Sequence, residues 1–508
     1  MSDEPQQPVI NFLRDPATHG GAPVERIDTH AASVFLAGDR AFKIKRAVRF
    51  PFLDFTTLRK RRAACETEIA VNRAYAPMIY RGAHPITREV NGRLAINGKG
   101  EPVEWVVEMR RFDQSQTLDH LAEAGRIDSA LADALGRAVA ASHRLVPAAT
   151  NAYFVGALAE IIAQNEAAFA AEPDLLSLQD LRALSAATRE AFERVKPMLL
   201  ARERAGLVRR CHGDLHLGNI VLIDGKPVLF DAIEFDDRIA TGDVLYDLAF
   251  LLMDLVERGL LQAANTVFNR YLTETQRIHD LDALAALPLF MSIRAAIRAK
   301  VIAARHRQSG LQLELAHSAR GYAVLAQKII TPAKPRLVAI GGLSGTGKSQ
   351  LARALAPNLA PLPGAVVLRS DVERKILFRT SETEKLPDRA YSMETTIRVY
   401  KGLAEKARRI TAAGYSAIID AVFAQPIERA EIAKSANEAS FQGLFLGASL
   451  ETRLARVRSR SGDVSDAGAA VARKQEDYDL GRLAWSKVDA SGTPDETLPR
   501  AEGMLGLK

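Results

Sequence analysis

The sequence is most constrained by a glycine-rich turn that joins a strand-like run to a helix-like run within RLVAIGGLSGTGKSQLARALAPNL, residues 336–359. The run RLVAI has the apolar character of a buried strand, and QLARALAPNL has apolar residues at the spacing of an amphipathic helix. Between them lies the pattern G-x-x-x-x-G-K-S, matched by Gly342, Gly347, Lys348 and Ser349. A strand, a loop and a helix in this order turn backbone N–H groups toward one point and form a cradle for phosphate. The segment therefore predicts an α/β domain with a parallel sheet and a phosphate site.

The polar positions of this loop have distinct expected roles. Lys348 is expected to reach the β and γ phosphates of a nucleotide, and Ser349 is expected to bind Mg²⁺. The backbone between the flanking glycines completes the cradle. The residues predicted to bind the nucleotide here are Gly342, Ser344, Gly345, Thr346, Gly347, Lys348 and Ser349.

Two further strand-like runs in this half end in an acid, because AVVLRSD ends at Asp371 and YSAIID ends at Asp420. The carboxyl ends of parallel strands meet at one edge of a sheet, where ligands bind, so both acids are expected beside the phosphate loop. Asp420 suits a metal or metal-water acceptor, and Asp371 suits a substrate anchor or base. For either acid alone a helix N-cap is an equally good interpretation, but their joint placement favours function.

The run ETRLARVRSRSGDVSDA places Arg453, Arg456 and Arg460 at helical spacings before a Gly-Asp loop. A solvated helix face is one interpretation of this pattern. The hypothesis that we favour is a lid, since arginines brought onto the γ-phosphate by closure stabilise charge during phosphoryl transfer.

A second chemical feature lies earlier, in RRCHGDLHLGNIVLIDGKPVLFDAIEFD, residues 209–236. The runs NIVLI and PVLFD flank the turn signal DGK, which predicts a tight hairpin. The predicted pairs are Ile223 with Val228 and Ile220 with Asp231.

The predicted register puts Asn219 beside Asp231. An amide oxygen and a carboxylate side by side suit Mg²⁺, which takes oxygen ligands. Asp214, five residues before Asn219 on the loop that leads into the hairpin, can accept the proton of a substrate hydroxyl next to that metal. The loop is therefore predicted to hold a base, Asp214, and two metal ligands.

The pattern H-G-D-x-x-x-x-N at residues 212–219 resembles the catalytic loop of the aminoglycoside phosphotransferase family, which is related to protein kinases. The later run GDVLYDLAFLL also resembles that family, so the similarity extends over most of residues 25–330. The resemblance implies an α+β protein-kinase-like domain with the base and metal ligands at the positions named above. For His212, a structural role in which the backbone satisfies the ring is favoured over direct chemistry.

Kinases of this type also need a lysine on a small-lobe strand, paired with a helical glutamate, to hold the α and β phosphates. The run AFKIKR offers Lys43 and Lys45 on one strand face, and CETEIAVNR offers Glu66 and Glu68. Of the possible pairs we predict Lys43 with Glu68, and the others stay open.

The same resemblance places the adenine site and shows one departure from the family pattern. The run EWVVEMRRF resembles the hinge, where the backbone of Glu108 and Met109 would meet adenine. The glycine-rich nucleotide loop of such kinases is missing, since DTHAASVFLAG contains no G-x-G-x-x-G. The preference for ATP over GTP therefore stays open.

From the phosphate loop to about residue 480, the chain resembles small P-loop kinases such as gluconate kinase, chloramphenicol phosphotransferase and the zeta toxins. The runs RSDVERK and IIDAVF fall where that group has its substrate and metal acids. The short length and the lack of clear sensor segments argue against a motor ATPase of the AAA class. Together, the two halves resemble a two-domain bacterial family in which an aminoglycoside phosphotransferase-like domain is fused to an ATP-binding domain.

The pattern along the chain agrees with more than one domain, as 508 residues allow. Short β-branched runs with Asn-Gly turn signals mark 30–110, and alanine-rich helical patterns mark 117–205 and 243–330. The predicted domains are a kinase-like domain over 1–330, with a small lobe over about 1–110 and a large helical lobe over about 111–330, then a linker over 331–335 and a P-loop kinase domain over 336–508.

Composition argues against several other classes of protein. Lys and Arg number 68 against 61 Asp and Glu, and no basic tract is interleaved with aromatic residues, which disfavours nucleic-acid binding. No apolar run approaches the roughly 20 residues that span a bilayer, and the polar N-terminus has no signal pattern, so we expect a cytoplasmic protein without a membrane partner. Cys65 and Cys211 stand far apart, in no metal-like spacing.

The sequence therefore predicts an ATP- and Mg²⁺-dependent phosphotransferase that acts on hydroxyl groups of small molecules, such as a sugar, an amino sugar or an antibiotic-like compound. Two active sites would serve two substrates or two steps on one substrate. The alternative is regulatory: one half senses for the other or restrains it, as an antitoxin controls a toxin. A kinase of nucleic-acid ends is a third class, which the composition disfavours.

Overall fold

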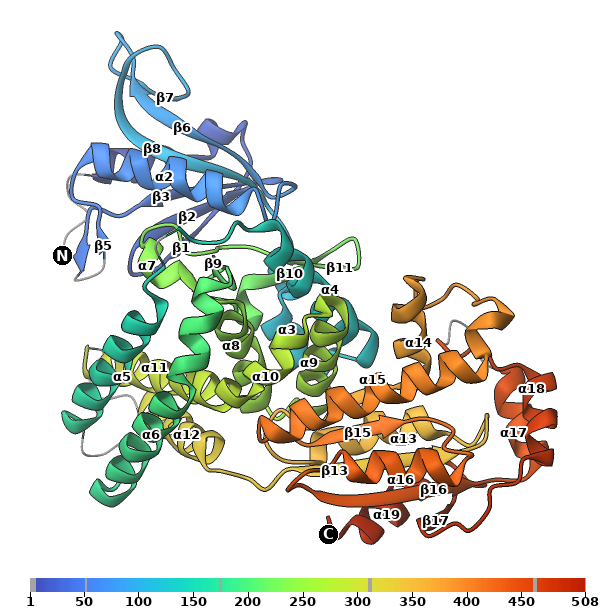
Figure 1. Cartoon of the computed structure of the whole chain (residues 1–508). Coiled ribbons are helices and arrows are strands. Elements are labelled where there is room, and N and C mark those ends of the chain that lie inside the picture. Colours follow the sequence, from blue (N-terminus) through green and yellow to red (C-terminus); the bar gives the residue numbers. More distant parts are fainter. Residues whose placement is uncertain are drawn as a thin grey trace. The chain divides into compact units, whose positions relative to one another are not determined.

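The computed structural model of the chain describes residues 6–50, 53–150, 152–172, 176–308, 313–459 and 464–507 (Figure 1). The packing of the backbone divides the chain into two compact units. The first unit comprises residues 1–163 and 196–254, and the second unit comprises residues 164–195 and 255–508. Each unit is therefore built from two stretches that are separate in the sequence.

A six-stranded sheet forms the N-terminal part of the first unit. Its strand order is β1-β2-β3-β8-β6-β7, and all neighbouring strands are antiparallel. The strand-rich region predicted over 30–110 is confirmed. The strands of this sheet are β1 (Val24–Asp28), β2 (Ala32–Ala37), β3 (Arg40–Lys45), β6 (Tyr80–Arg88), β7 (Leu94–Ile96) and β8 (Glu101–Arg110), and a separate small hairpin consists of β4 (Arg49–Phe50) and β5 (Leu53–Asp54).

Alternation of side chains along β3 distinguishes the two faces of this sheet. Phe42 points to the face that packs against helix α1 (Gln7–Arg14) in one apolar cluster. Lys43 points to the opposite face, which helix α2 (Leu58–Asn72) covers (Figure 1). Helix α2 begins after Thr57, whose side chain accepts a hydrogen bond from the backbone of the first turn. The small lobe therefore has an apolar face under α1 and a charged face under α2.

Helices and two short antiparallel pairs complete the first unit. The strands β10 (Ile220–Ile223) and β11 (Lys226–Leu229) form a hairpin, and β9 (Val208–Arg210) pairs with β12 (Thr241–Asp243). The other helices within this unit are α3 (Leu118–Glu123), α4 (Ser129–Leu145) and α7 (Asp237–Ala240). The division between the units passes through α5 (Phe154–Ala170), α6 (Leu178–Arg204) and α8 (Val244–Glu257).

The second unit continues with helices over 255–330, as the alanine-rich pattern predicted. These are α9 (Leu261–Thr275), α10 (Ile278–Asp282), α11 (Leu287–Gln308) and α12 (Leu313–Ile330). Helices α11 and α12 pack along one another, and the Ser292 hydroxyl donates to the Ala326 carbonyl at 2.9 Å. None of the described helices of the chain combines the length and the apolar character that crossing a bilayer requires.

A five-stranded sheet forms the core of the C-terminal part of the second unit. Its strand order is β14-β15-β13-β16-β17, and every pair is parallel, so the parallel sheet predicted from the phosphate loop is confirmed. The strands are β13 (Arg336–Gly342), β14 (Val366–Arg369), β15 (Ala417–Asp420), β16 (Ser440–Gly447) and β17 (Ser486–Asp489).

Helices flank this sheet (Figure 1). Ile340 and Leu446 of the sheet pack with Leu351 and Leu505 in one buried apolar cluster, which joins the helix after the phosphate loop to the C-terminal helix. The helices are α13 (Lys348–Leu355), α14 (Ser370–Phe378), α15 (Met393–Ala412), α16 (Pro426–Lys434), α17 (Leu450–Arg458), α18 (Ala469–Lys474) and α19 (Pro494–Leu505).

The predicted linker over 331–335 lies in the coil between α12 and β13. The compact units follow a different division, because the helices over 255–330 group with the P-loop sheet and not with the small-lobe strands. The helices of the predicted large lobe are therefore divided between the two units.

Candidate active sites

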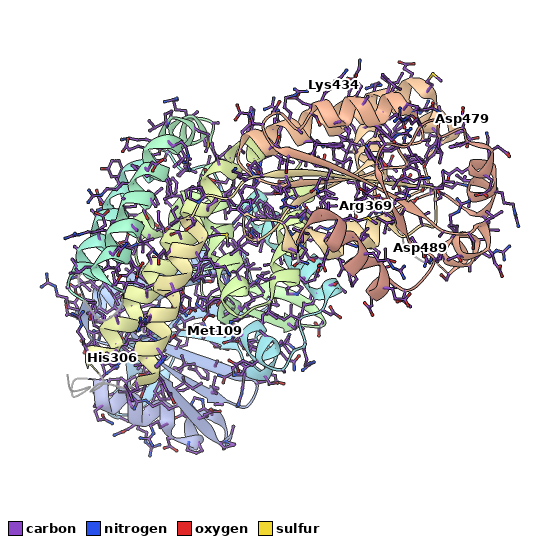
Figure 2. The ribbon with its side chains drawn as sticks, turned by 90° about the horizontal axis from the view of Figure 1, so that it is seen from below. Met109, His306, Arg369, Lys434, Asp479 and Asp489 are labelled. Carbon is purple, nitrogen blue, oxygen red and sulfur yellow. The ribbon has the colours of Figure 1, made fainter. Side chains whose placement is uncertain are left out.

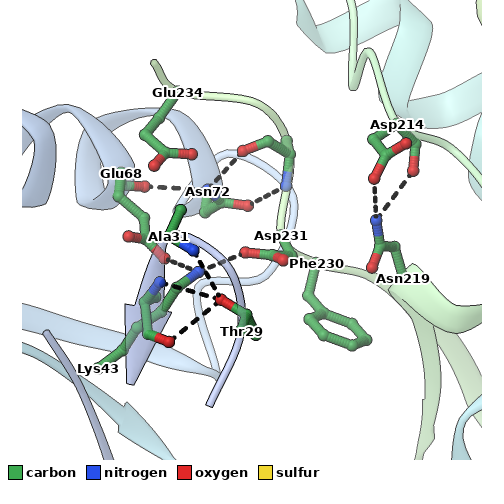
Figure 3. Close-up of polar contacts among 12 residues, drawn as sticks. Thr29, Ala31, Lys43, Glu68, Asn72, Asp214, Asn219, Phe230, Asp231 and Glu234 are labelled. Atoms are coloured by element: carbon green, nitrogen blue, oxygen red, sulfur yellow. Dashed lines mark hydrogen bonds and ion pairs between the residues drawn. The ribbon is translucent and has the colours of Figure 1, made fainter. Parts of the chain in front are cut away.

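The first candidate site lies on the α2 face of the six-stranded sheet, where Lys43 meets two carboxylates (Figure 3). Lys43 Nζ lies 2.8 Å from Glu68 Oε1 and 2.7 Å from Asp231 Oδ1. Glu68 is a fully buried residue of α2, and Asp231 lies two residues after β11. The ion pair of Lys43 with Glu68 that the sequence predicted is present, and Asp231 is its third member.

The contacts of the neighbouring residues exclude Glu66 from the pairs that the sequence left open, whereas both lysines contact Glu68. Lys45 Nζ lies 2.6 Å from Glu68 Oε2 and also pairs with Glu234, so the two lysines share Glu68. Glu66 is half exposed and lies 2.9 Å from Arg62 Nε, one turn earlier on α2. Glu66 is therefore on the outer side of the helix. Glu234, three residues after Asp231, was not recognised in the sequence.

Burial and opposite charge act against each other in this cluster. Burial alone would lower the pKa of the Lys43 ammonium group, but the carboxylates of Asp231 and Glu68 raise that pKa well above its ordinary value. Burial likewise opposes ionisation of Glu68, yet Lys43 and Lys45 lower its pKa to about 2. The Lys43 ammonium group and the Glu68 carboxylate are therefore charged at neutral pH, which gives Lys43 the charge that its predicted phosphate-binding role requires.

The loop before β10 carries Asp214, the predicted base. The Asn219 side chain donates from Nδ2 to the Asp214 carbonyl oxygen at 3.0 Å and to Asp214 Oδ2 at 3.1 Å (Figure 3). The Asp214 side chain is 41% exposed, so a substrate hydroxyl can reach it. Gly213 turns the chain into this loop with a φ of 82°, in the left-handed region that favours glycine.

Buried groups beneath the loop fix its position. Asp247 of α8 accepts backbone hydrogen bonds from His212 at 3.3 Å and from Gly213 at 2.8 Å. The His212 ring donates from Nε2 to the Phe230 carbonyl at 2.9 Å, while its buried Nδ1 has no hydrogen-bond partner among the described residues. Burial lowers the pKa of His212, since a second ring N–H would have no acceptor. His212 is therefore a neutral residue bonded to backbone, which agrees with the structural role favoured from the sequence.

The hairpin that follows has a different register from the predicted one. Ile220 pairs with Leu229 and not with Asp231, because the turn contains two residues, Asp224 and Gly225, where the prediction allowed four. Both turn residues have positive φ, 51° and 72°, which matches a two-residue turn to the twist of the hairpin. The predicted register was therefore wrong by two positions.

The corrected register still brings the two predicted metal ligands close together. The Phe230 N–H donates to the Asn219 carbonyl at 3.0 Å, and Asn219 and Asp231 lie on either side of Phe230 in Figure 3. Because Asn219 Nδ2 is bonded to Asp214, its Oδ1 is the end left for a cation. Asp231 is 43% exposed and uses Oδ1 on Lys43. An amide oxygen and a carboxylate oxygen fit Mg²⁺ as ligands.

Two side chains that the sequence analysis missed hold Asp231 in place. Asp231 has a φ of 58°, and its N–H donates to Tyr80 Oη at 3.0 Å. The next N–H, of Ala232, donates to Asn72 Oδ1 at 2.7 Å. Tyr80 is 151 positions from Asp231, so no local pattern could have found this contact.

The second candidate site is the loop between β13 and α13. Gly342, Gly345 and Gly347 have φ values of 143°, 88° and 93°, which other residues rarely adopt. A Cβ on Gly345 would lie 2.6 Å from the backbone oxygen of Arg453. Helix α13 begins at Lys348, directly after the loop. The strand, loop and helix predicted from this motif are therefore confirmed.

Side chains of the loop and its neighbours bond across the cradle. Lys348 Nζ donates to the Leu343 carbonyl at 3.1 Å, and Thr346 Oγ1 donates to the same oxygen at 2.8 Å. The Ser344 N–H donates to Gln475 Oε1 at 2.7 Å. The loop is thus held by hydrogen bonds within itself and by one from η8 (Gln475–Asp477). Contact of Lys348 with nucleotide phosphates stays a prediction.

Ser349 and Asp420 meet at the carboxyl edge of the parallel sheet through Arg369, which is labelled in Figure 2. Arg369 Nη2 donates to Ser349 Oγ at 3.2 Å, and Arg369 Nε donates to Asp420 Oδ2 at 3.3 Å. Asp420 is not a helix N-cap, since α16 begins after Gln425. A hydroxyl and a carboxylate fit Mg²⁺. The sequence analysis missed Arg369, although it ends the strand within AVVLRSD.

Asp371 lies in the first turn of α14, just beyond the end of β14. The N-cap of this helix is Arg369, so the N-cap interpretation of Asp371 is wrong. Asp371 therefore lies at the sheet edge expected for it, and its role as a base or substrate anchor stays a prediction.

Comparisons with known proteins match each half of the chain separately. A family model described as "Phosphotransferase enzyme family" matches residues 93–287, which include Asp214. A second model, described as "AAA domain", matches residues 337–478, which include Lys348.

Two mycobacterial proteins match nearly the whole chain. "Uncharacterized protein Rv2004c" of Mycobacterium tuberculosis and "Uncharacterized protein Mb2027c" of Mycobacterium bovis are each 30% identical over 491 residues, which covers 93% of this chain and 94% of the relative. The chain belongs to their family. In this family member, an aminoglycoside phosphotransferase-type kinase domain precedes a P-loop kinase domain, as the sequence predicted.

Solved structures show more distant similarity to this family member. A choline/ethanolamine kinase family protein from Mesorhizobium loti is 15% identical and covers 65% of this chain and 96% of its own, with a TM-score of 0.39. A gluconokinase from Sinorhizobium meliloti 1021 is 18% identical and covers 34% of this chain and 92% of its own, with a TM-score of 0.26.

The hinge predicted for this family member at Glu108 and Met109 is wrongly placed. Both residues lie within β8, whose backbone pairs with β3 on one side and β6 on the other at these positions, so it is not open to adenine. The Glu108 carboxylate lies 2.8 Å from Arg40 Nη2 and lines a groove of about 760 Å³ on the α1 face. Beyond the end of β8, Phe112 packs against Phe230, with ring centroids 5.0 Å apart.

The predicted lid is contradicted for the two arginines that the structure describes. Arg453 is buried and donates from Nη1 to the Ser344 carbonyl at 3.4 Å, so it supports the phosphate loop from behind. Arg456 donates from Nη1 to the Ala490 carbonyl at 2.8 Å, beyond the end of β17. Both guanidinium groups are bound to backbone because α17 packs directly against these segments. The third predicted residue, Arg460, lies outside the described residues.

Proposed function

We propose that the chain is an ATP- and Mg²⁺-dependent phosphotransferase with two active sites, each of which transfers the γ-phosphoryl group of ATP to a hydroxyl of a small molecule. A sugar, an amino sugar or an antibiotic-like compound is the proposed acceptor. One observation carries the proposal: two separate clusters each combine a cation for phosphate, oxygen ligands for a metal and a carboxylate for the acceptor. The clusters are Lys43, Asn219, Asp231 and Asp214 in the first unit, and Lys348, Ser349, Asp420 and Asp371 in the second unit.

In the first site, Lys43 would bind the nucleotide phosphates, and Glu68 keeps it in position. Asn219 Oδ1 and the second oxygen of Asp231 would hold Mg²⁺, which when bound neutralises charge on the phosphates. The acceptor oxygen forms a bond to the γ-phosphorus while the bond to the β-phosphate oxygen breaks. The hydroxyl proton passes to Asp214, and ADP leaves.

In the second site, the backbone N–H groups of the phosphate loop and the N-terminus of α13 would bind the phosphates, with Lys348 beside them. Ser349 and Asp420 would hold Mg²⁺. Asp371 is the proposed base or anchor for the acceptor. This site would be complete without any residue of the first cluster.

The experiment is a screen of sugars, amino sugars, nucleosides and aminoglycoside-type antibiotics with γ-labelled ATP, using the full chain and the variants Asp214→Asn and Lys348→Ala. If both sites are active, the labelling of one product should depend on Asp214 and the labelling of another should depend on Lys348. The two products can come from different acceptors or from the same acceptor. If no acceptor is labelled in a manner that depends on either residue, the proposal fails.

A regulatory relation between the halves is the second candidate function. It is favoured by the contacts that tie the helices over 255–330 to the P-loop domain, such as Arg409 Nη1 at 2.8 Å from Asp282 Oδ2. In that case one site would give no product of its own, and its substitution would change the rate of the other site.

A further inference from the structure

Helix α9 belongs to the phosphotransferase-family match by sequence, yet it packs against the edge strand of the P-loop sheet. The match covers residues 93–287, and α9 and β14 lie in the same compact unit and contact one another. Strand β14 is the first strand of the sheet order, so within the described part of the chain one of its sides pairs with another strand and the other side does not. The other side presents backbone groups that must find partners elsewhere.

One asparagine of α9 supplies those partners with its side-chain amide. Asn269 Oδ1 accepts the Val367 N–H at 2.7 Å, and Asn269 Nδ2 donates to the Ala365 carbonyl at 3.1 Å. An amide side chain offers one donor and one acceptor, as a backbone peptide does. Asn269 therefore pairs with β14 as a neighbouring strand would.

A second asparagine, one turn earlier on α9, holds the segment that leads into the strand. Asn265 is buried, and its Nδ2 donates to the Pro363 carbonyl at 3.2 Å and the Ala365 carbonyl at 3.0 Å. Asn269 also donates to Asn265 Oδ1 at 3.0 Å, so the two amides form one network. Asn265 is buried and Asn269 is partly buried, and a shift of either amide would leave polar groups without their partners, so the network favours a single geometry.

The strand held in this way ends at the metal edge of the phosphate site. Arg369 is the last residue of β14, two positions after Val367, and it bonds to both Ser349 and Asp420. Arg369 and Asp420 are also partners in the register of β14 with β15. A shift of β14 along or away from α9 would therefore move the guanidinium that lies between the two metal-ligand candidates.

Further contacts fix the helical segment against the P-loop domain. Arg270 Nη1 lies 2.8 Å from Glu382 Oε1, and the rings of Phe268 and Tyr415 lie 5.9 Å apart. These contacts come from the same helix as the two asparagines. Helix α9 is therefore held at several points along its length.

We propose that α9 is a positioning element of the P-loop site, with Asn265 and Asn269 as the residues that hold β14 and, through it, Arg369 at the Ser349–Asp420 edge. The proposal rests on the proposed function only in that this site binds a nucleotide with Mg²⁺. A helix of the phosphotransferase-type domain thereby sets the metal edge of the kinase domain that follows it.

The experiment uses the full chain with Asp231→Ala, which disables the first site, and measures binding of AMP-PNP with and without Mg²⁺ by titration calorimetry. Asn269→Ala should weaken the Mg²⁺-dependent binding by about tenfold, the value of one to two lost hydrogen bonds, and leave Mg²⁺-free binding unchanged. Hydrogen exchange of the Val367 amide should accelerate in the same variant. Thr266→Ala is the matched control, because its hydroxyl donates to the Gln262 carbonyl of its own helix.

Asn269→Asp keeps the oxygen that accepts from Val367 and removes the donor to Ala365, so it should fall between the wild type and Asn269→Ala in both measurements. Equal binding in the wild type and Asn269→Ala, together with loss of binding in Lys348→Ala, would overturn the inference and leave the proposed function intact. A parallel loss of Mg²⁺-free binding would also overturn it, since that result indicates general unfolding of the site. If Lys348→Ala has no effect on binding in this chain, the proposed function of the second site fails, and the inference fails with it.

Discussion

The two candidate sites are built in opposite ways. The phosphate cradle of the second unit comes from consecutive residues, because one strand, one glycine-rich loop and one helix N-terminus form it. The cation of the first site is instead held by residues distant in sequence, since Lys43 and Asp231 are 188 positions apart. A contiguous site is specified by local conformation, whereas a dispersed site exists only after the sheet, α2 and the hairpin have packed.

This difference extends to what surrounds each site. The first site is supported by residues from within its own unit, such as Asp247 beneath the loop that carries Asp214 and Tyr80 beside Asp231. The second site has a local cradle, but its metal edge leads to Arg369 and from there to α9. A local motif thus forms the predicted phosphate cradle, and long-range packing decides the geometry around the candidate metal ligands.

The largest expected effect is on the transfer rate of the first site, the one whose residues are distant in sequence. Asp214→Asn should lower the transfer rate of the first site by roughly 10²- to 10⁴-fold, because the acceptor proton loses its base, while ATP binding changes little. Rapid-quench transfer assays and nucleotide titrations measure the two quantities. Asp224→Asn, the same change in the exposed hairpin turn, should retain full activity. Near-wild-type turnover of Asp214→Asn would exclude it as the base.

Removal of the lysine of the second site should abolish the activity of that site without affecting the first site. Lys348→Ala should reduce product formation at the second site by about 10²-fold or more, because the charge beside the transferring phosphoryl group is lost, and should leave the first site unchanged. Lys334→Ala, a charge change in the coil before β13, is the control. A loss of the Asp214-dependent product in Lys348→Ala would show that the two sites are not independent.

A smaller effect tests whether Asn219 and Asp231 share one cation despite the corrected register. Asn219→Ala and Asp231→Ala should each weaken Mg²⁺-dependent nucleotide binding, and the double variant should lose much less than the sum of the two, with a coupling of about 0.5–3 kcal/mol. Titrations of all four chains close the cycle. Strictly additive losses would mean that the two side chains do not act on the same ion.

The smallest effect concerns the pH dependence of stability. Burial lowers the pKa of His212 in the folded chain, whereas in the unfolded chain the ring has its ordinary pKa of about 6.5. As the pH falls below this value, the unfolded chain therefore binds more protons than the folded chain. This contribution to stability is therefore present above that pH and is lost as the pH falls, with a slope of at most about 1.4 kcal/mol per pH unit. Urea unfolding between pH 7.5 and 5.5 should show a shallower slope for His212→Gln than for the wild type.

A matched control for the pH experiment is His279→Gln, because the His279 side chain is 75% exposed. That variant should keep the wild-type slope. An unchanged slope in His212→Gln would show that the buried ring does not carry the effect.

Much of the fold follows from the sequence, because its signals are local. The short β-branched runs before residue 110 indicated the strand-rich region that forms the antiparallel sheet, and the glycine pattern after β13 indicated the parallel sheet and its cradle. The ion pair of Lys43 with Glu68 was also within reach of the sequence, because the resemblance to kinases implies such a pair and the two runs offer only two lysines and two glutamates.

Each wrong prediction depended on how a segment turns, pairs or packs in the folded chain. The hairpin register depended on a turn of two residues with positive φ. The hinge was placed inside β8 because a single strand does not reveal that both of its sides are paired. Arg453 and Arg456 have the spacing of an exposed helical face, but α17 packs on the phosphate loop and buries the first of them.

The sequence by itself determined the two kinase-type domains, the phosphate cradle and most of the charged residues of the sites, because each is encoded in a short pattern of glycines, alternation or motif spacing. Only the tertiary structure decided which partners these residues have. Glu234 joins Lys45, Tyr80 holds Asp231, and Asn269 completes the edge of β14 from outside the P-loop domain. These contacts link distant positions through single hydrogen bonds and ion pairs, which leave no periodic signal along the chain and arise only when packing brings the segments together.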